Sequence, residues 1–283
     1  DPAIVQVPFP DGYWTEDTSF ELFLATLAKK GLRPENVAGV MFETYQGAGP
    51  DFAPVDYIHQ LAKWCKTHDA LLVFDEVQAG FGRTGKFWAF EHYGVTPDVI
   101  CCGKGISSSL PLSAVIGRAE IMDQFGPGSM SSTHTGNPVC CAAALANLKK
   151  ITAENLTENA ARMGEILEAG LKEIQQRHAE VIGHSTCRGL VGGLQMTRPG
   201  KKEPDHDLAH DVIERCFHKG LLFSGPVGAW GQTVKIAPPL TITEGAVREG
   251  LAVLGEAVDE AVAALKPPAK RERRELVTDG VLG

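Results

Sequence analysis

The chain lacks any uninterrupted run of the roughly 18 apolar residues that a membrane-spanning helix needs. It also lacks an excess of positive charge, because 27 lysines and arginines are outnumbered by 35 aspartates and glutamates, for a formal net charge of −8. That balance creates no field that would attract nucleic acid phosphates or an anionic membrane surface. We therefore expect a soluble protein that binds small molecules, with neither nucleic acid nor a membrane among its partners.

A basic leader is missing as well, because residues 1–14 mix prolines with Asp1 and Asp11. The chain begins at Asp1 rather than at a methionine, and we expect its natural start to be missing. None of the seven cysteines forms a Cys-x-x-Cys pair, and most lie in apolar runs such as residues 99–102. Cysteines in such positions indicate reduced, buried thiols, so we expect a cytoplasmic protein.

Neither internal repeats nor a metal-binding pattern accompanies this composition. His206 and His210 share one face of an expected helix, but the glutamate of the zinc motif and a third ligand are absent, so we expect no metal site. Gly80, Gly82 and Gly85 match the dinucleotide-binding fingerprint in form only, because they follow an aspartate and open no clear helix.

Four short apolar runs are present, at residues 37–42, 70–74, 98–102 and 113–117. Such runs are typical of strands that are covered on both faces. Between the first two, a helix starts at Pro54 and continues with apolar residues at helical spacing. We therefore predict an α/β fold with a mostly parallel sheet, whose ligands gather at the carboxyl ends of the strands.

The pattern changes after residue 150. Asn137 and Pro138 start a helix that leads into it, residues 154–177 predict a long amphipathic helix, and a last helix begins after Thr243. Between these helices we expect weak strands near 180–184, 188–196, 221–224 and 233–236 and a helix at 206–219. We divide the chain into a larger domain of residues 1–150, a smaller α+β domain of residues 151–266, and a solvated, disordered tail of residues 267–283.

Two polar residues follow two of the expected strands. Asp75 ends the second strand, and Lys104 stands between Gly103 and Gly105 just after the third. Taken singly, each has an ordinary explanation as a turn aspartate and a loop lysine. Together, at 104 − 75 = 29 positions apart on neighbouring strand ends, they match the pairing of pyridoxal phosphate sites, where lysine holds the aldehyde carbon and a carboxylate the ring nitrogen.

The motifs around these residues resemble those of the class III aminotransferases of the 4-aminobutyrate aminotransferase type. Asp-Glu-Val-Gln at 75–78, Gly-Arg-Thr-Gly at 82–85, Lys104, and Thr-x-x-Gly-Asn-Pro-x-x-Cys-Ala-Ala-Ala at 133–144 occur in the family's order. The resemblance extends from Ile4 to Leu265. It implies pyridoxal 5′-phosphate as cofactor and the fold-type-I architecture, with the N-terminal part of the large domain missing from residues 1–150.

The resemblance also implies a role for each matching residue. Lys104 looks like the lysine that forms the Schiff base and later moves a proton between the substrate α-carbon and the cofactor C4′. Asp75 looks like the partner of the ring nitrogen, Val77 like the residue packed on the ring face, and Gln78 like the one that reaches the ring hydroxyl. Thr133 is similar to the threonine that reaches the phosphate of the other subunit, which implies a homodimer with shared active sites.

Two positions bear on the substrate. Glu43 matches the family glutamate that pairs with a substrate-binding arginine, but the arginine's own position is occupied by Lys235. A lysine is a point charge rather than a planar two-pronged donor, so two-pronged capture of a carboxylate is weakened. The family's small-residue phosphate turn and its ring-stacking aromatic residue have no counterpart here, since neither 107–109 nor 126–129 clearly opens a helix.

The reaction implied by the resemblance is a ping-pong transamination, in which an amine donor delivers its amino group to the cofactor and a 2-oxo acid removes it. Two alternatives remain open. One is a decarboxylase or epimerase on the same scaffold, because residues 235–244 also resemble 2,2-dialkylglycine decarboxylase. The other is a non-catalytic homologue that dimerises or regulates without turnover.

Overall fold

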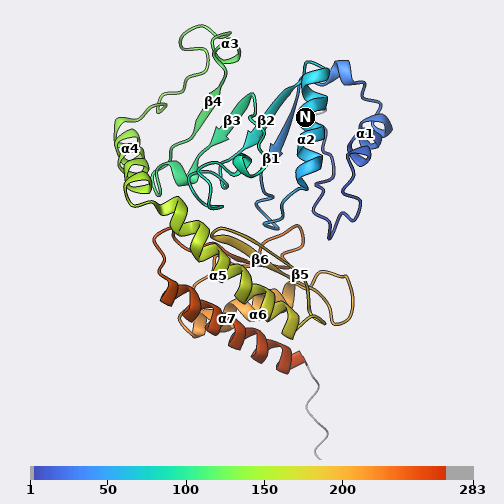
Figure 1. Cartoon of the computed structure of the whole chain (residues 1–283), viewed down its shortest axis with the longest axis vertical. Coiled ribbons are helices and arrows are strands. Elements are labelled where there is room, and N and C mark those ends of the chain that lie inside the picture. The colour runs from blue at the N-terminus through green and yellow to red at the C-terminus, as the bar shows by residue number, and fades with distance from the viewer. Residues whose placement is uncertain (1–2, 266–283) are drawn as a thin grey trace, which may run out of the picture.

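The chain forms two sheets that lie one above the other, joined by two consecutive long helices (Figure 1). The computed structural model describes residues 3–265, so the expected tail of residues 267–283 lies outside the described residues. We call the part built on strands β1–β4 the four-stranded half and the part built on β5–β7 the three-stranded half. Within residues 3–265, no helix is both long and apolar enough to cross a bilayer.

The elements follow one another in a simple order. The four-stranded half contains α1 (Phe20–Lys29), β1 (Gly39–Glu43), α2 (Val55–Thr67), β2 (Leu71–Asp75), β3 (Val99–Cys102), β4 (Ala114–Gly117) and α3 (Ala119–Met122), with short 3-10 helices at Pro34–Asn36, Ala89–His92 and Lys104–Ile106. Then follow α4 (Pro138–Ala153), α5 (Leu156–Arg177), β5 (Ile182–Arg188), β6 (Val191–Met196), α6 (His206–His218), β7 (Thr233–Ile236) and α7 (Glu244–Leu265).

The first sheet has the order β1-β2-β3-β4, with β1, β2 and β3 parallel and β4 antiparallel to β3. The expectation of a mostly parallel sheet is therefore confirmed. In the register of this sheet Glu43 stands beside Asp75, and Asp75 stands beside Cys101. Because parallel strands end at the same edge, the residues that follow β1, β2 and β3 are brought close together.

Helix α2 secures this sheet from one face. Its buried side chains are Tyr57, Ile58, Leu61, Trp64 and Cys65, and they form one core with residues of β1, β2 and α1. The spacing of these residues is the helical spacing seen in the sequence, so the prediction of a strand-helix-strand unit here is confirmed.

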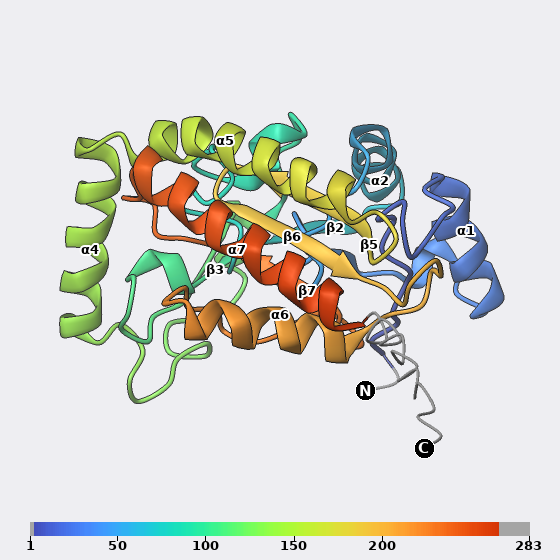
Figure 2. The same cartoon turned by 90° about the horizontal axis from the view of Figure 1, so that it is seen from below.

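The second sheet, β5-β6-β7, is antiparallel throughout. Helices α5, α6 and α7 lie across one of its faces (Figure 2) and bury the largest apolar cluster of the molecule's described part. Two predicted helix starts are confirmed. The Asn137 side chain accepts hydrogen bonds from the amides of Val139 and Cys140 at 3.0 and 3.3 Å, and Thr243 accepts one from Ala246 at 3.4 Å.

The strand expected at residues 221–224 is wrong. Among residues 3–265 this segment has no ladder partner, although Leu221 and Phe223 turn towards the apolar cluster while Leu222 is 73% exposed. Gly225, with a φ of 109°, and Pro226 follow it directly and lead the chain away. Alternating burial produced the pattern of a strand, but pairing depends on a neighbour that the sequence does not reveal.

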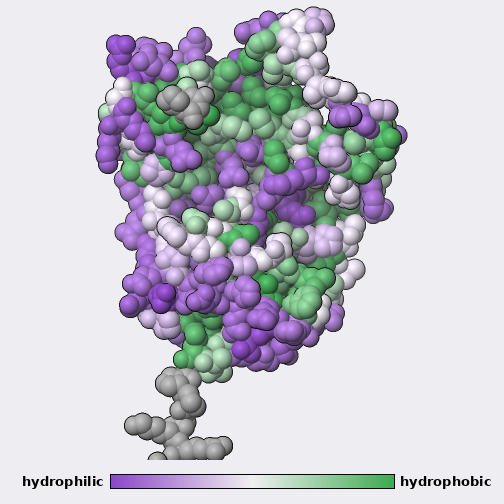
Figure 3. All heavy atoms as spheres, turned by 180° about the vertical axis from the view of Figure 1, so that it is seen from behind, coloured by the Kyte–Doolittle hydropathy of each residue, from purple (hydrophilic) through white to green (hydrophobic). Residues whose placement is uncertain are grey.

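The four-stranded half presents an apolar surface. Figure 3 shows apolar residues gathered over this half on the face opposite to that of Figure 1, and hydrophilic residues prevail over much of the other half. Strands β1 and β4 contribute to the exposed apolar residues with Met41 at 61%, Val115 at 55% and Ile116 at 48%.

The two halves approach each other closely at Gly189, in the turn between β5 and β6. A Cβ atom on Gly189 would lie 2.3 Å from the carbonyl carbon of Thr84 and 2.6 Å from the amide nitrogen of Gly85. On its other side, a Cβ on Gly164 of α5 would lie 2.5 Å from the Gly189 Cα. The φ of Gly189 is 56°, so both its conformation and its surroundings require glycine.

Replacing Gly189 by alanine is expected to lower the free energy of unfolding by about 2 to 5 kcal/mol, the sum of left-handed strain and overpacking. Denaturant unfolding measures this loss. The matched control is Gly200→Ala, because Gly200 has a φ of 69° but nothing within 4 Å of its added Cβ. It should lose only about 1 to 2 kcal/mol, and equal losses in the two variants would show that the close approach at Gly189 is not what costs stability.

Candidate active site

Three predicted site residues lie at adjacent strand ends of the first sheet. Glu43 is the last residue of β1, Asp75 the last of β2, and Lys104 follows β3 after Gly103. The carboxyl of Asp75 accepts a hydrogen bond from the Val77 amide at 2.9 Å, which orients its Oδ1 towards its own turn. The sequence prediction that these residues share one sheet edge is therefore confirmed in its geometry.

Glu76, directly after Asp75, is turned into the protein instead. It is fully buried, and its two carboxyl oxygens accept hydrogen bonds from the backbone amides of Ala89 and Phe90 at 2.9 and 2.8 Å. Burial raises the pKa of Glu76 to about 7, and these amides oppose the rise. Of the two neighbouring acids, Asp75 is thus the one at the sheet edge, and Glu76 anchors the short helix at Ala89–His92.

Lys104 opens a three-residue 3-10 helix and occupies an unusual backbone conformation. Its φ is 39°, in the left-handed region that side chains with a Cβ rarely adopt. Strained backbone of this kind costs about 1 to 3 kcal/mol and is typical of functional sites. Gly103 and Gly105 on either side leave room for the turn, since a Cβ on Gly105 would already press on Phe81 at 3.3 Å.

Gln78 and Lys235 are brought into direct contact, although 157 positions separate them. The Oε1 of Gln78 accepts hydrogen bonds from the Lys235 Nζ and from the Tyr45 hydroxyl, the latter at 2.9 Å. Lys235 also donates to the Gly47 carbonyl and lies 5.5 Å from the centre of the Tyr45 ring. Within residues 3–265 the Nε2 of Gln78 makes no hydrogen bond, so it is available to a ligand.

The electrostatics of the site follow from its enclosure. The pKa of Lys235 is lowered to about 8, chiefly by burial and also by nearby Lys104 and Arg83, whereas Glu43 opposes them. Desolvation by neighbouring atoms raises the pKa of Glu43, as does Asp75, whereas the Gly47 amide, Lys104 and Lys235 lower it. The site therefore holds a lysine whose charge changes near neutral pH.

Arg83 ties the loop after β2 to the three-stranded half. Its Nη1 donates to the carbonyls of Leu190, at 2.9 Å, and of Pro238, and its own carbonyl accepts the Leu190 amide at 2.9 Å. Burial lowers the pKa of Arg83. The guanidinium thus adds a cation to the wall of the site while it joins the two halves.

A cavity of about 1340 Å³ lies between the two halves and is lined by Lys104, Gln78, Lys235, Tyr45 and Arg83. This volume exceeds that of most single-ligand pockets, so it has room for a cofactor together with a substrate. Asp75, Val77 and Glu43 are not among the lining residues; Glu43 and Asp75 end their strands, and Val77 follows β2. Val77 packs against the Lys104 turn, since a Cβ on Gly103 would be 3.5 Å from its Cγ1.

Thr133 is not brought to the cavity. It is exposed in the segment before α4, and the cavity wall does not include it. From the sequence we expect this residue to serve the other subunit of a dimer, and its exposure leaves it accessible to a second subunit. His206 and His210 of α6 have ring centres 6.3 Å apart, and residues 3–265 contain no group of three His, Cys, Asp or Glu side chains placed to hold a metal.

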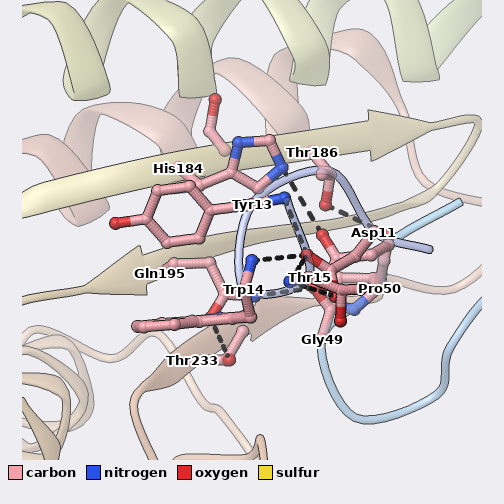
Figure 4. Close-up of polar contacts among 12 residues, drawn as sticks. Asp11, Tyr13, Trp14, Thr15, Gly49, Pro50, His184, Thr186, Gln195 and Thr233 are labelled. Atoms are coloured by element: carbon pink, nitrogen blue, oxygen red, sulfur yellow. Dashed lines mark hydrogen bonds and ion pairs between the residues drawn. The ribbon is translucent and has the colours of Figure 1, made fainter. Parts of the chain in front are cut away.

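The loop at residues 46–51, which holds Lys235 through Gly47, is fastened to the three-stranded half by buried polar contacts (Figure 4). Gln195 of β6 donates to the Gly49 carbonyl at 3.0 Å, and Thr186 of β5 donates to the Pro50 carbonyl at 3.1 Å. The Oε1 of Gln195 also accepts hydrogen bonds from Trp14 and Thr233, at 3.3 and 2.9 Å. Every polar atom of this buried amide is used, which makes the loop rigid.

Sequence reasoning missed Tyr45, Arg83 and Gln195. Arg83 stood inside the quoted Gly-Arg-Thr-Gly motif, but its partners are carbonyls far along the chain. Tyr45 follows Glu43 closely and could have been found from its place after a strand end. No local signal marks Gln195, because an isolated glutamine in an apolar strand shows neither its depth nor its partners.

An α/β fold that places an acid and a lysine at adjacent strand ends is the architecture of pyridoxal-phosphate-type enzymes. The pattern of class III aminotransferases matches residues 2–258, and the chain belongs to this family.

Individual relatives agree with this family. The chain is 36% identical over 234 residues to the 5-aminovalerate aminotransferase DavT of Pseudomonas aeruginosa, covering 82% of this chain and 54% of the relative. It is 37% identical over 267 residues to the isoleucine 2-epimerase of Lentilactobacillus buchneri, covering 90% and 58%. A crystal structure of a Bacillus anthracis aminotransferase matches with a TM-score of 0.81 and 34% identity over 90% of this chain and 61% of that one. The chain thus spans little more than half the length of these relatives.

Proposed function

We propose that this protein is a pyridoxal-phosphate-dependent aminotransferase that transfers an amino group from an amine or amino acid donor to a 2-oxo acid by a ping-pong mechanism. The observation that carries the proposal is the placement of Lys104 and Asp75 at adjacent ends of parallel strands, beside a cavity lined by four cationic residues, Arg83, Lys104, Lys150 and Lys235. Pyridoxal phosphate supplies an aldehyde that condenses with amines, and a ring that takes up the electron pair of a broken bond.

Each residue then has a defined task. With the cofactor bound, the Nζ of Lys104 would hold it covalently, and the same amine would move a proton between the substrate α-carbon and the cofactor. Asp75 would keep the ring nitrogen protonated, Val77 would pack on the ring face, and the free Nε2 of Gln78 would donate to the ring hydroxyl. Thr133 reaches the phosphate of the other subunit in a cytoplasmic homodimer with shared active sites.

On the substrate side, Lys235 binds the donor's carboxylate or another anionic group, and Glu43 tunes that lysine electrostatically. We further propose that residues 1–150 form the cofactor-binding domain and residues 151–266 the smaller domain. Two relatives support the aminotransferase assignment: DavT and the Bacillus anthracis protein are described as aminotransferases.

To test this function, 15N-labelled amines and amino acids are incubated with pyruvate or 2-oxoglutarate and the purified full-length protein, in the presence of pyridoxal phosphate, and the transfer of the label is measured. Transfer of the label to the 2-oxo acid, with parallel lines in double-reciprocal plots, is the expected result. Inversion of the donor's α-carbon without a 2-oxo product would instead establish an epimerase, as in the Lentilactobacillus buchneri relative. Release of CO2 would establish a decarboxylase. The absence of any product would indicate a non-catalytic protein.

The pKa of Lys235 leads to a separate prediction about how the KM of the donor depends on pH. Only the protonated amine holds an anion, so the KM of a carboxylate-bearing donor, relative to that of an amine of similar basicity without a carboxylate, should stay constant below the pKa of about 8 and rise roughly tenfold per pH unit above it. Lys235→Arg should remove this rise, because arginine keeps its charge. Lys235→Met should raise the KM by about 10- to 100-fold below pH 8, the loss of one charged hydrogen bond, and by progressively less above it.

The control for pH is an amine of similar basicity without a carboxylate, whose KM should follow only the donor's own ionisation. A rise in KM above pH 8 that persists in Lys235→Arg would show that another group binds the donor.

A further inference from the structure

The turn that carries Lys104 is held by a side chain from a different element. Asn147 of α4 donates its Nδ2 to the Gly105 carbonyl at 2.7 Å and to the Ile106 carbonyl at 3.2 Å. Both partners are carbonyl oxygens, which only accept, so the amide must present its nitrogen to them. One side chain thereby satisfies two consecutive carbonyls of the 3-10 helix Lys104–Ile106.

The Asn147 hydrogen bonds matter because the backbone of the turn is strained and the turn's own hydrogen bonds are weak. Lys104 and Ser108 both have left-handed backbones, with φ values of 39° and 66°. Within the turn, the Ile106 amide donates to Gly103 at 2.9 Å, but the next bond, from Ser107 to the Lys104 carbonyl, is stretched to 3.4 Å. A single turn of 3-10 helix does not sustain two such residues without outside support.

Apolar packing brings α4 to the turn but does not orient it. Ala144 and Ile151, one turn before and after Asn147, are buried, and Ile106 and Leu148 pack in the cluster around Ile151. Such contacts are non-directional. The carbonyl groups of Gly105 and Ile106, directly after Lys104 in the same 3-10 turn, are held in place by the Asn147 hydrogen bonds, and this fixes the turn from which the Lys104 side chain extends.

We propose that Asn147 is a positioning residue for the reaction at Lys104, because its two hydrogen bonds keep the lysine in its strained conformation and direct the Nζ into the cavity. The inference rests on the proposed function, in which Lys104 holds the cofactor.

Three variants of the full-length protein test it. Asn147→Leu keeps the size of the side chain and removes the hydrogen-bond donor. Asn147→Asp places a carboxylate next to the Gly105 and Ile106 carbonyl oxygens, which it repels. Asn159→Leu is the matched control, because Asn159 of α5 clamps another loop in the same way, donating to the Leu240 and Ile242 carbonyls at 2.8 and 3.0 Å.

The first measurement needs no cofactor. Hydrogen-deuterium exchange of the amides at residues 105–107 should be about 10- to 100-fold faster in both Asn147 variants, the effect of two ordinary hydrogen bonds on local opening. In Asn159→Leu exchange there should match the wild type, although its melting temperature falls by a similar amount.

The second measurement is the rate at which added pyridoxal phosphate gives a visible band that borohydride fixes on Lys104, together with steady-state kinetics. Both Asn147 variants should capture the cofactor more slowly and lose about 10- to 100-fold in kcat with little change in donor KM, as a misplaced reacting group does. Asn159→Leu should capture it at the wild-type rate.

The outcomes separate the inference from the function beneath it. Unchanged exchange at residues 105–107 in Asn147→Leu, or equal slowing of cofactor capture in Asn159→Leu, would overturn the positioning role while the wild type still forms its band. A wild-type protein that forms no borohydride-fixed band on Lys104 would overturn the proposed function, and this inference with it.

Discussion

Replacing Lys104 by alanine is expected to abolish the covalent attachment of pyridoxal phosphate that borohydride reduction makes permanent in the wild-type protein. It should also lower kcat by at least about 10³-fold, because the same amine serves as covalent partner and as proton carrier. The alanine variant keeps the backbone and the neighbouring Asn147 contacts, so the fold should survive. Absorbance before and after borohydride, followed by mass spectrometry of the peptide that contains residue 104, measures the effect.

A second variant separates chemistry from folding. Lys104→Gly should be as inactive as the alanine variant, yet about 1 kcal/mol more stable in denaturant, because glycine adopts the φ of 39° without strain. If borohydride still attaches the cofactor covalently in either variant, another lysine carries it. If it attaches no cofactor to the wild-type protein either, the non-catalytic alternative is the one that remains.

Replacing Asp75 by asparagine is expected to lower kcat by about 10²- to 10³-fold, the usual effect of removing one group that stabilises developing charge. An amide cannot keep the ring nitrogen protonated, so the ring loses much of its capacity to accept electrons. The variant should fold normally, because the asparagine Oδ1 can still accept the Val77 amide that Asp75 accepts at 2.9 Å. Steady-state kinetics with a saturating donor measure the change.

The same sheet offers a matched control in Asp98. This aspartate stands just before β3, at the opposite end of the strands, where it accepts the Leu72 amide at 2.8 Å and pairs with Arg118 at 3.2 Å. Asp98→Asn keeps the acceptor and loses only a partly exposed ion pair, worth up to about 1 kcal/mol. It should retain wild-type kcat. If both variants lose activity equally, the loss at Asp75 reflects folding rather than charge at the cofactor.

The strands and helices of the four-stranded half were accessible to sequence reasoning because their signals are local. Apolar runs at 70–74 and 98–102 correspond to β2 and β3 within a residue or two, and Asn137 caps α4 as its type and position predict. From these positions it followed that Asp75 and Lys104 share one edge of a parallel sheet. The roles of the site residues stay proposals for the experiments above.

Where sequence reasoning failed, the deciding partner was distant. Residues 221–224 alternate between buried and exposed as a strand would, but the part of the chain that the structure describes gives them no ladder partner. Asn147 looked like an ordinary helix residue, and only the approach of α4 to the Lys104 turn makes it a donor to two carbonyls. The contact between Lys235 and Gln78 likewise requires the two halves to be assembled.

By itself, then, the sequence determined the family, the mostly parallel sheet and the strand-end positions of the reactive acid and lysine, because periodicity and strand ends depend on neighbours in the chain. Only the tertiary structure decided which side chains support them. The hydrogen bonds of Arg83, Gln195 and Asn147 join residues up to 181 positions apart. Such contacts arise from the packing of separate elements, and no local pattern records which surfaces will meet.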